Sequence, residues 1–175
     1  MKAVAFDLGH TLMDELRDLH VPIEARPVHL MPGVSEALRK FSLPLAVWAN
    51  TRVARAADVR AWLDRAGLPV FRWVITSTDA GARKPSPDFF RYALEHCGLT
   101  TEDVLFVGNQ LNTDVAGAEA FGIRTVWLSG RAYRSPDDVA CDARPTYTIE
   151  TLHDLPALVR QLEDRSGPAV GHQRP

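Results

Sequence analysis

Short apolar runs alternate with helix-like segments along most of this 175-residue chain. Each apolar run is too short for a helix and ends at polar or glycine residues, which is typical of a strand buried on both faces. The segments between the runs repeat apolar residues at helical spacing. Strands that alternate with helices predict βαβ units with right-handed crossovers and a mostly parallel sheet. We therefore expect an α/β fold in which residues 1–162 form a single three-layer domain.

The same patterns place the individual elements. The predicted strands are Val4–Phe6, Leu45–Ala49, Phe71–Thr76, Val104–Val107, Thr125–Leu128 and a short edge strand, Tyr147–Ile149. The predicted helices are Val34–Phe41, Ala54–Ala66, Pro87–Cys97, Asp114–Phe121 and Leu155–Leu162. Asp14–Leu30 has no clear period and predicts a loop or flap, with one helical turn around Glu15–Leu19. Residues 163–175 contain little to bury, and we expect a mobile tail there.

The composition argues against several classes of protein. The formal charge is −2, so no basic field favours nucleic acid or an anionic membrane as a partner. No apolar run approaches the roughly 20 residues of a transmembrane helix. The two cysteines, Cys97 and Cys141, form no CxxC pair, and Met1 and Lys2 lead into the first strand without a signal peptide. We therefore expect a cytoplasmic protein.

Polar side chains and glycines follow the predicted strands at their carboxyl ends. They are Asp7, Gly9 and Thr11 after the first strand, Asn50 and Thr51 after the second, and Asn109 and Asp114 after the fourth. Arg83 and Lys84 follow the third strand, in the stretch GARKPSP. The carboxyl ends of parallel strands meet at one edge of an open sheet, where such folds bind ligands. Carboxylates and a lysine at that edge suggest a site for phosphate with Mg²⁺, which prefers a few carboxylates, water and phosphate oxygen.

These residues resemble the four motifs of the haloacid dehalogenase-like (HAD) superfamily. Its first motif, D-x-D-x-[TV], is similar to DLGHT at residues 7–11. Its second, a Ser or Thr that ends the second strand before Asn, is similar to Ala49-Asn50-Thr51. The third, a lysine before a proline-rich helix start, matches KPSP at residues 84–87, and the fourth, G-D-x-x-x-x-D, is similar to GNQLNTD at residues 108–114. The resemblance covers Lys2 to Leu162 and implies a Rossmann-like fold with a minimal cap.

The resemblance also implies a role for each matching residue. Asp7 is the expected nucleophile, which attacks phosphorus to give an aspartyl-phosphate, and Lys84 stabilises the charges. The expected ligands of Mg²⁺ are Asp7, the backbone oxygen of Gly9, Asn109 and Asp114. The expected phosphate-binding residues are Asn50, Thr51 and Lys84.

Three residues depart from the family pattern. Gly9 stands where phosphatases of this family usually carry the Asp that acts as general acid and base, a function that supplies about 10²–10⁴-fold in rate. Asn109 replaces a carboxylate that normally helps to bind the metal, which should weaken Mg²⁺ binding. Ala49 takes the usual Ser or Thr position and leaves Thr51 as an imperfect substitute. We expect a weakened site whose nucleophile and lysine are intact.

His10 lies beside the expected nucleophile, where the family usually has glycine. Because histidine titrates near neutrality, we hypothesise that His10 supplies the missing acid–base function. Gly9 alone does not exclude a phosphatase, since some phosphatases of the superfamily share a D-x-G motif. The haloacid dehalogenases also lack the second Asp, need no metal and carry Asn and Asp in their fourth motif. Their helical cap, however, is much longer than Asp14–Leu30.

The sequence therefore predicts a HAD-like hydrolase, namely a Mg²⁺-dependent phosphatase that acts on a phosphorylated substrate through Asp7. The alternative is a catalytically impaired HAD fold that binds a partner or phosphorylated ligand, motivated by Gly9, Ala49 and Asn109. A metal-independent 2-haloacid dehalogenase is the third reading. Capless members of the superfamily often act on larger substrates or form oligomers, so both remain open for this chain.

Overall fold

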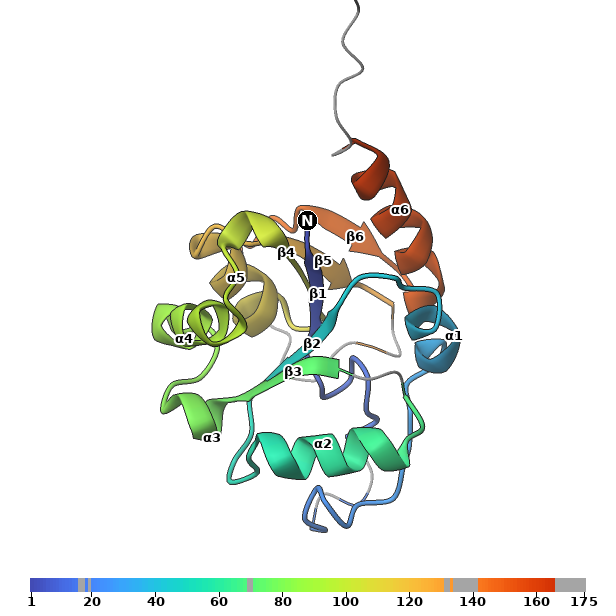
Figure 1. Cartoon of the computed structure of the whole chain (residues 1–175), viewed down its shortest axis with the longest axis vertical. Helices are drawn as coiled ribbons and strands as arrows, with labels where there is room; N and C mark the ends of the chain where they lie inside the picture. The colour runs from blue at the N-terminus through green and yellow to red at the C-terminus, as the bar shows by residue number, and fades with distance from the viewer. Residues whose placement is uncertain (16–17, 19, 69–70, 131–132, 134–141, 166–175) are drawn as a thin grey trace, which may run out of the picture.

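The sheet places the end of the first strand at the centre of the molecule. The computed structural model describes residues 1–15, 18, 20–68, 71–130, 133 and 142–165. In these residues, six parallel strands form one sheet of order β3-β2-β1-β4-β5-β6 (Figure 1). β1 pairs with both β2 and β4, so the residues that follow it emerge between the ends of its two neighbours. The predicted α/β class and parallel sheet are confirmed.

The strands agree closely with the sequence prediction. They are β1 (Ala3–Phe6), β2 (Leu45–Ala49), β3 (Phe71–Thr76), β4 (Val104–Gly108), β5 (Arg124–Leu128) and β6 (Tyr147–Ile149). Every residue of β1, β2 and β4 is buried, as expected for strands covered by helices on both faces. The prediction succeeds because such strands are continuous apolar runs.

The helices form the two outer layers. They are α1 (Val34–Leu38), α2 (Ala56–Arg65), α3 (Ser77–Ala80), α4 (Pro87–Cys97), α5 (Ala116–Ala120) and α6 (Leu155–Arg165), with 3₁₀ turns at Thr101–Asp103 and Leu152–Asp154. α4 begins as its sequence predicts: the Asp88 N–H donates to Ser86 Oγ at 3.3 Å, and Pro87 occupies the first turn. None of the described helices is long and apolar enough to cross a membrane.

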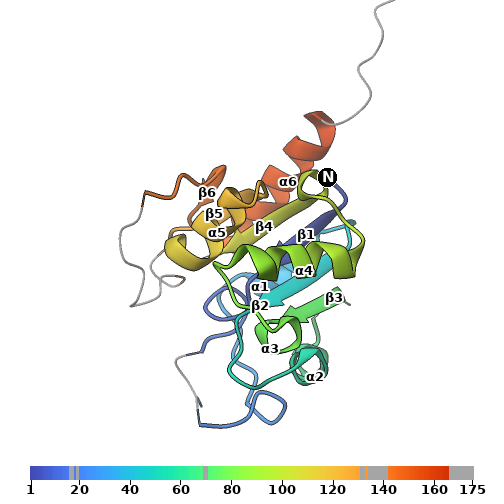
Figure 2. The ribbon, with the colours of Figure 1, turned by 90° about the vertical axis from the view of Figure 1, so that its left-hand side faces the viewer.

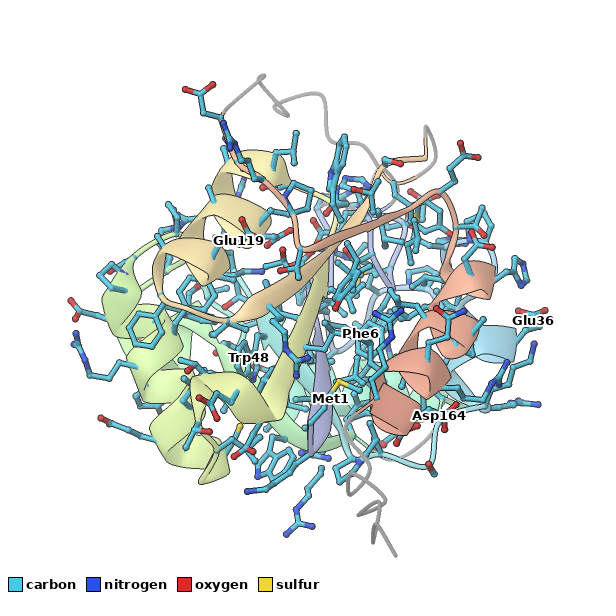
Figure 3. The ribbon with its side chains drawn as sticks, turned by 90° about the horizontal axis from the view of Figure 1, so that it is seen from above. Met1, Phe6, Glu36, Trp48, Glu119 and Asp164 are labelled. Atoms are coloured by element: carbon cyan, nitrogen blue, oxygen red, sulfur yellow. The ribbon has the colours of Figure 1, made fainter. Side chains whose placement is uncertain are left out.

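Each face of the sheet has its own hydrophobic core. Helices α1, α2 and α6 cover one face, and α4 and α5 cover the other (Figure 1). Phe6 points into the first core and Trp48 into the second, on opposite sides of the sheet (Figure 3). Successive residues of a strand point to opposite faces, so the same short apolar runs supply both cores.

Some predicted helices differ in extent from those in the structure. α3 was not predicted, because a four-residue helix shows no apolar period; the Asp79 N–H caps it by donating to Thr76 Oγ1 at 3.1 Å. The predicted helix Asp114–Phe121 consists of a π-helix, Leu111–Val115, followed by α5. α1 ends at Leu38, before the predicted Phe41. α6 extends to Arg165, and the rest of the expected tail, residues 166–175, lies outside the described residues.

The segment between β1 and α1 lies beside α2, and its described residues contain no helix (Figure 2). Its two ends are held together, since the Asp14 N–H donates to the His29 carbonyl at 2.8 Å. In α2, Trp62 Nε1 donates to the carbonyl of Pro27 at 3.4 Å, which ties the segment to that helix. The helical turn expected around Glu15–Leu19 falls largely outside the described residues.

The packing of α5 against Pro85 can be tested by a single methyl group. A Cβ on Gly117 would lie 2.8 Å from Cα and Cβ of Pro85 and 2.9 Å from the ring of Phe90. We expect Gly117→Ala to lower the free energy of unfolding by about 1–3 kcal/mol through overpacking, although alanine favours helix by roughly 1 kcal/mol. Urea denaturation measures this change. Ala120→Gly, at an exposed position of α5, is the control and should lose only the contribution of helix propensity. A Gly117→Ala variant whose free energy of unfolding is unchanged would contradict the close packing of α5 on Pro85.

Candidate active site

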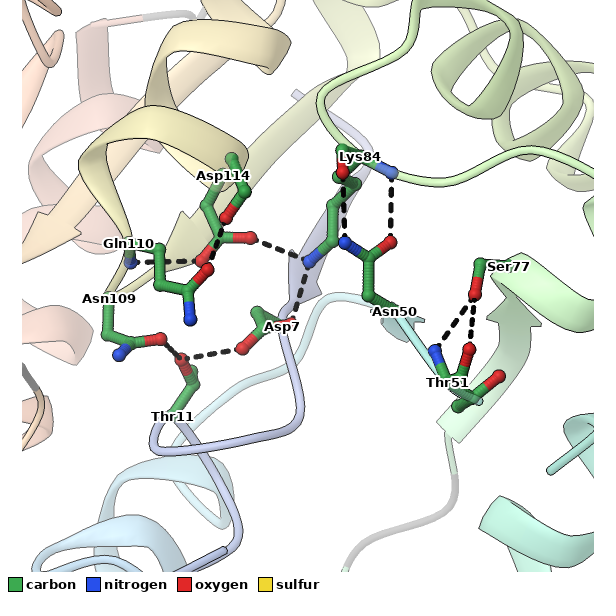
Figure 4. Close-up of polar contacts among 10 residues, drawn as sticks. Asp7, Thr11, Asn50, Thr51, Ser77, Lys84, Asn109, Gln110 and Asp114 are labelled. Carbon is green, nitrogen blue, oxygen red and sulfur yellow. Dashed lines mark hydrogen bonds and ion pairs between the residues drawn. The ribbon is translucent and has the colours of Figure 1, made fainter. Parts of the chain in front are cut away.

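A buried lysine joins two buried aspartates at the carboxyl ends of β1 and β4 (Figure 4). Lys84 Nζ lies 2.7 Å from Asp7 Oδ1 and 2.6 Å from Asp114 Oδ1. Asp7 is 8% exposed, and Lys84 and Asp114 are each 2% exposed. Buried charges are stable only when they are paired, so this cluster is a strong constraint on the fold. The structure thus brings together three site residues that were predicted from the sequence.

The cluster contains two carboxylates for one ammonium group. Burial raises the pKa of Asp7, although the Lys84 ammonium acts in the opposite direction. Burial and the charge of Asp7 together raise the pKa of Asp114 to about 6. Burial disfavours the charged lysine, but the carboxylates of Asp114 and Asp7 outweigh it and hold the pKa of Lys84 above its usual value. Lys84 is therefore protonated at neutral pH, and the two carboxylates share it.

The second oxygen of Asp7 faces a different pair of side chains. Thr11 Oγ1 donates to Asp7 Oδ2 at 3.3 Å and also lies 3.4 Å from Asn109 Oδ1. Asn109 is fully buried, and its backbone carbonyl accepts a hydrogen bond from Trp127 Nε1 at 3.0 Å. Asp7 is thus bound at Oδ1 by the ammonium group of Lys84 and at Oδ2 by the neutral hydroxyl of Thr11, which also contacts Asn109.

Hydrogen bonds to the backbone fix the lysine and its second partner. Asn50 Nδ2 donates to the carbonyl of Lys84 at 2.9 Å, and the Lys84 N–H donates to Asn50 Oδ1 at 2.8 Å. The Gln110 N–H donates to Asp114 Oδ2 at 3.1 Å. A Cβ on Gly108 would lie 2.6 Å from the carboxyl group of Asp114, so only glycine at this position permits the approach. Asn50 therefore positions Lys84, a contact that the sequence did not predict.

Thr51 forms its hydrogen bonds on the side of α3 (Figure 4). Its N–H donates to Ser77 Oγ at 2.9 Å, and Ser77 Oγ donates to the Thr51 carbonyl at 3.0 Å. The Thr51 hydroxyl donates to the carbonyl of Ala54 at 2.8 Å and lies 2.9 Å from the hydroxyl of Thr78. Because the side chains of Thr51 and Asn50 already have partners, their role in phosphate binding remains a prediction.

A cavity of about 490 Å³ opens beside Asn50 and Thr51. Leu8, next to the first aspartate, forms part of its wall, as does Glu15 from the segment between β1 and α1. The wall also contains three arginines, Arg26, Arg52 and Arg83. Among the described residues of this wall, three arginines face one carboxylate, so the cavity favours an anionic ligand.

His10 adopts the left-handed backbone conformation, with φ of 54°, and its N–H donates to the Met13 carbonyl at 2.7 Å. Its ring is half-buried. Burial lowers the pKa of His10, against the opposing effect of the Asp14 charge. The acid–base role suggested for His10 stays a prediction.

The oxygen atoms at the cluster have the chemistry that Mg²⁺ requires. Asp7 Oδ2 and Asn109 Oδ1 both lie within 3.4 Å of Thr11 Oγ1. Mg²⁺ binds oxygen ligands of this kind and retains several waters. Within the described ranges, however, no group of three His, Cys, Asp or Glu side chains is arranged to hold a metal ion. The oxygen ligands therefore suit Mg²⁺, but their total negative charge is low, because Asn109 contributes an oxygen atom without a negative charge.

Two residues that shape the site, Ser77 and Glu15, were missed in the sequence. Ser77 directly follows β3, so the strand-end rule that found Asp7 could have identified it. Glu15 belongs to a segment without periodicity and to none of the four motifs, and no local signal marks it. Its position depends on how the segment folds back over the sheet edge.

Comparison with known proteins identifies relatives of this chain. A family model described as HAD-hydrolase-like matches residues 81–155. The chain is 34% identical over 129 residues to the glyceraldehyde 3-phosphate phosphatase of Methanocaldococcus jannaschii, which is 72% of this chain and 53% of that protein. It is 34% identical over 99 residues to the pyrimidine 5'-nucleotidase YjjG of Escherichia coli, which is 55% of this chain and 42% of that protein. The chain thus spans about half the length of the curated relatives it matches.

The fold is also similar to that of solved structures. The HAD-hydrolase YfnB of Bacillus subtilis bound to magnesium superposes with a TM-score of 0.71 at 18% identity. The match covers 90% of this chain and 98% of that chain. At this identity the similarity shows the fold alone, and it confirms the predicted Rossmann-like arrangement.

The charge balance of the cluster predicts how stability depends on pH when Lys84 is removed. Asp114 has a pKa of about 6 in the folded protein against a usual 3.8, so its contribution to stability is fully present below 3.8 and is lost as the pH rises through 6. Removing the ammonium group strengthens this effect for both carboxylates. We expect Lys84→Met to lower the free energy of unfolding by about 3–5 kcal/mol at pH 8 and by less at pH 5.

Urea denaturation of the Lys84→Met variant at both pH values measures this. Arg83→Met, at the exposed neighbouring position, is the matched control and should change stability little at either pH. An equal loss for Lys84→Met at pH 5 and pH 8 would show that the lysine acts through packing rather than through charge.

Proposed function

This chain belongs to the haloacid dehalogenase-like (HAD) superfamily, and we propose that it is a hydrolase that cleaves phosphate monoesters through Asp7. The observation that carries the proposal is the contact of Asp7 with Lys84, at the carboxyl end of the central strand β1. There, a carboxylate is held rigidly at the edge of the sheet where open α/β folds bind ligands. Relatives named glyceraldehyde 3-phosphate phosphatase and pyrimidine 5'-nucleotidase support the proposal.

The reaction takes place in two displacements at phosphorus. A carboxylate oxygen of Asp7 bonds to phosphorus while the bond to the ester oxygen breaks, which releases the alcohol and leaves an aspartyl-phosphate. Water then attacks phosphorus, the bond to Asp7 breaks, and inorganic phosphate leaves. The ammonium group of Lys84 fixes the attacking carboxylate and offsets the negative charge that gathers in both steps. Asp114 holds Lys84 in place from the opposite side.

We assign Mg²⁺ as the cofactor of this site. The residues that would hold it are Asp7, Asn109, Asp114 and the backbone oxygen of Gly9. Bound there, Mg²⁺ offsets the repulsion between an anionic nucleophile and an anionic phosphate. The magnesium-bound structure of YfnB, which has the same fold, supports this assignment.

The proposed substrate is a phosphorylated molecule whose remaining part lies in the cavity beside Asn50. The arginines of the cavity wall support an anionic substrate. Because no helical cap covers this edge of the sheet in the described residues, the cavity admits substrates of different sizes. We place the reaction in the cytoplasm, which is consistent with two cysteines that form no disulfide-like pattern.

Replacement of the nucleophile tests the proposed function. Asp7→Asn retains the shape of the side chain but removes the attacking carboxylate, so we expect kcat to fall by more than about 10³-fold. The assay is phosphate release from a panel of phosphate monoesters, with Mg²⁺ and with EDTA. Asp88→Asn, on the exposed side of α4, is the control and should leave the activity unchanged.

The other readings of the sequence give different results in the same assay. Tight binding of a phosphorylated ligand without turnover would instead indicate a binding module, the reading that Gly9, Ala49 and Asn109 motivate. Release of halide from a 2-haloacid in the presence of EDTA would indicate a dehalogenase. Absence of Mg²⁺-dependent hydrolysis across the panel would contradict the proposed function.

The charge at position 109 should control the affinity for Mg²⁺. Asn109→Asp adds a carboxylate to the oxygen atoms near Asp7, so we expect the dissociation constant for Mg²⁺ to fall roughly tenfold. Without Mg²⁺ the variant should be less stable than the wild type, because a third carboxylate then shares one lysine. Titration calorimetry and urea denaturation measure the two effects. Gln161→Glu, at an exposed position of α6, adds the same charge and should change neither the dissociation constant for Mg²⁺ nor the free energy of unfolding.

A further inference from the structure

The carboxylate of Glu15 fills the space beside Gly9. A Cβ on Gly9 would lie 2.4 Å from the carboxyl carbon of Glu15, 2.4 Å from its Oε2 and 2.9 Å from its Oε1. Real Cβ atoms do not approach other atoms so closely, so a side chain at position 9 and the carboxylate of Glu15 compete for one volume. Glycine at this position therefore allows a second carboxylate to lie against the loop that follows Asp7.

The backbone around Glu15 is held against the end of β1. Gly9 forms an isolated bridge with Met13, and the Asp14 N–H donates to the His29 carbonyl at 2.8 Å. Glu15 is only partly buried, and it lines the cavity that we assign to the substrate. Its carboxylate therefore adjoins both the nucleophile loop and the space from which a substrate reaches it.

The proposed reaction needs a proton donor and acceptor besides its nucleophile. The departing alcohol oxygen takes up a proton, and the water that hydrolyses the aspartyl-phosphate loses one. Lys84 is bound to two carboxylates, and Asp114 is held by Lys84 and by the Gln110 N–H. Within the described part of the chain, Glu15 lines the cavity, and its carboxylate also lies against Gly9 in the nucleophile loop.

We propose that Glu15 is the general acid and base of this site and occupies the volume that glycine leaves free at position 9. This inference rests on the proposed phosphatase function. The protonated carboxyl group of Glu15 donates its proton to the ester oxygen as the bond from that oxygen to phosphorus breaks. The resulting carboxylate takes a proton from water as the water oxygen bonds to phosphorus and the bond to Asp7 breaks. Glu15 then carries its proton again, and the cycle is closed.

Glu15→Gln tests the proposal through the dependence on the leaving group. With an alkyl phosphate, the poor leaving group needs the proton, so we expect kcat to fall by about 10²–10⁴-fold and no burst. With p-nitrophenyl phosphate, the first displacement needs no acid, but hydrolysis of the aspartyl-phosphate lacks its base. We therefore expect a burst of nitrophenol close to one equivalent per enzyme, followed by slow turnover. Glu24→Gln, at an exposed position of the same segment, is the control and should behave as the wild type.

A reciprocal exchange tests the shared volume at positions 9 and 15. Gly9→Asp alone should displace the carboxylate of Glu15 at little cost in stability, because the atoms that the new side chain meets are the end of a flexible side chain. Glu15→Ala alone should lose activity towards the alkyl phosphate. The double variant Gly9→Asp/Glu15→Ala places a carboxylate in the same volume from the other side, and we expect it to recover at least a tenth of the wild-type activity. Urea denaturation of all three variants separates folding from catalysis.

The outcomes separate this proposal from the proposed function. If Asp7→Asn abolishes hydrolysis but Glu15→Gln leaves it unchanged or raises it, Glu15 has no acid–base role, and only this inference is overturned. An equal loss on both substrates without a burst would show a structural role and would also overturn it. If the wild type hydrolyses no phosphate monoester, both proposals are wrong. Loss on the alkyl phosphate with a burst on the aryl phosphate supports both.

Discussion

The ammonium group of Lys84, buried between the carboxylates of Asp7 and Asp114, is the interaction on which the site depends. Each of these charges is unstable in the interior without the others. Their contacts at 2.7 Å and 2.6 Å therefore bind together the end of β1, the loop before α4 and the π-helix after β4. The hydrogen bonds of Asn50 tie the backbone of Lys84 to the end of β2, and the Gln110 N–H holds the carboxylate of Asp114. A parallel sheet with β1 at its centre brings these segments to one edge. The same arrangement of strands therefore buries the three charges together and places the nucleophile where a ligand can reach it.

The fold could be predicted from the sequence because it depends on local patterns. The buried strands are short apolar runs, and helix α4 carries its start and stop signals in Ser86, Pro87 and Gly98. The cluster of Asp7, Lys84 and Asp114 could be predicted because parallel strands must bring their carboxyl ends together. The contact between Asn50 and Lys84, the α3 helix and the position of Glu15 could not. They depend on loops whose paths are set by tertiary contacts, which leave no period in the sequence.

The contact between Gly9 and Glu15 offers an explanation for the glycine that replaces the family's usual aspartate at position 9. In the linear sequence, glycine removes a carboxylate from the loop after the nucleophile. In the folded chain, the same glycine makes room for a carboxylate from the segment between β1 and α1. The short segment that stands in place of a helical cap thus becomes part of the site. The second carboxylate thus comes from Glu15 rather than from position 9 of the first motif, but it lies at the same edge of the sheet as Asp7.

In the proposed reaction, Asp7 forms a covalent bond to phosphorus during turnover. It can be tested by mixing the enzyme with a phosphate monoester and Mg²⁺, quenching within the first turnovers and treating the denatured protein with borohydride. Borohydride reduces an acyl phosphate to an alcohol and leaves a free carboxylate unchanged, so peptide mass spectrometry identifies the reacted residue. We expect homoserine at position 7 in the wild type and in larger amount in Glu15→Gln, where the second displacement is slow. Hydrolysis that proceeds with aspartate unmodified at position 7, or with the modification at another carboxylate, would contradict it.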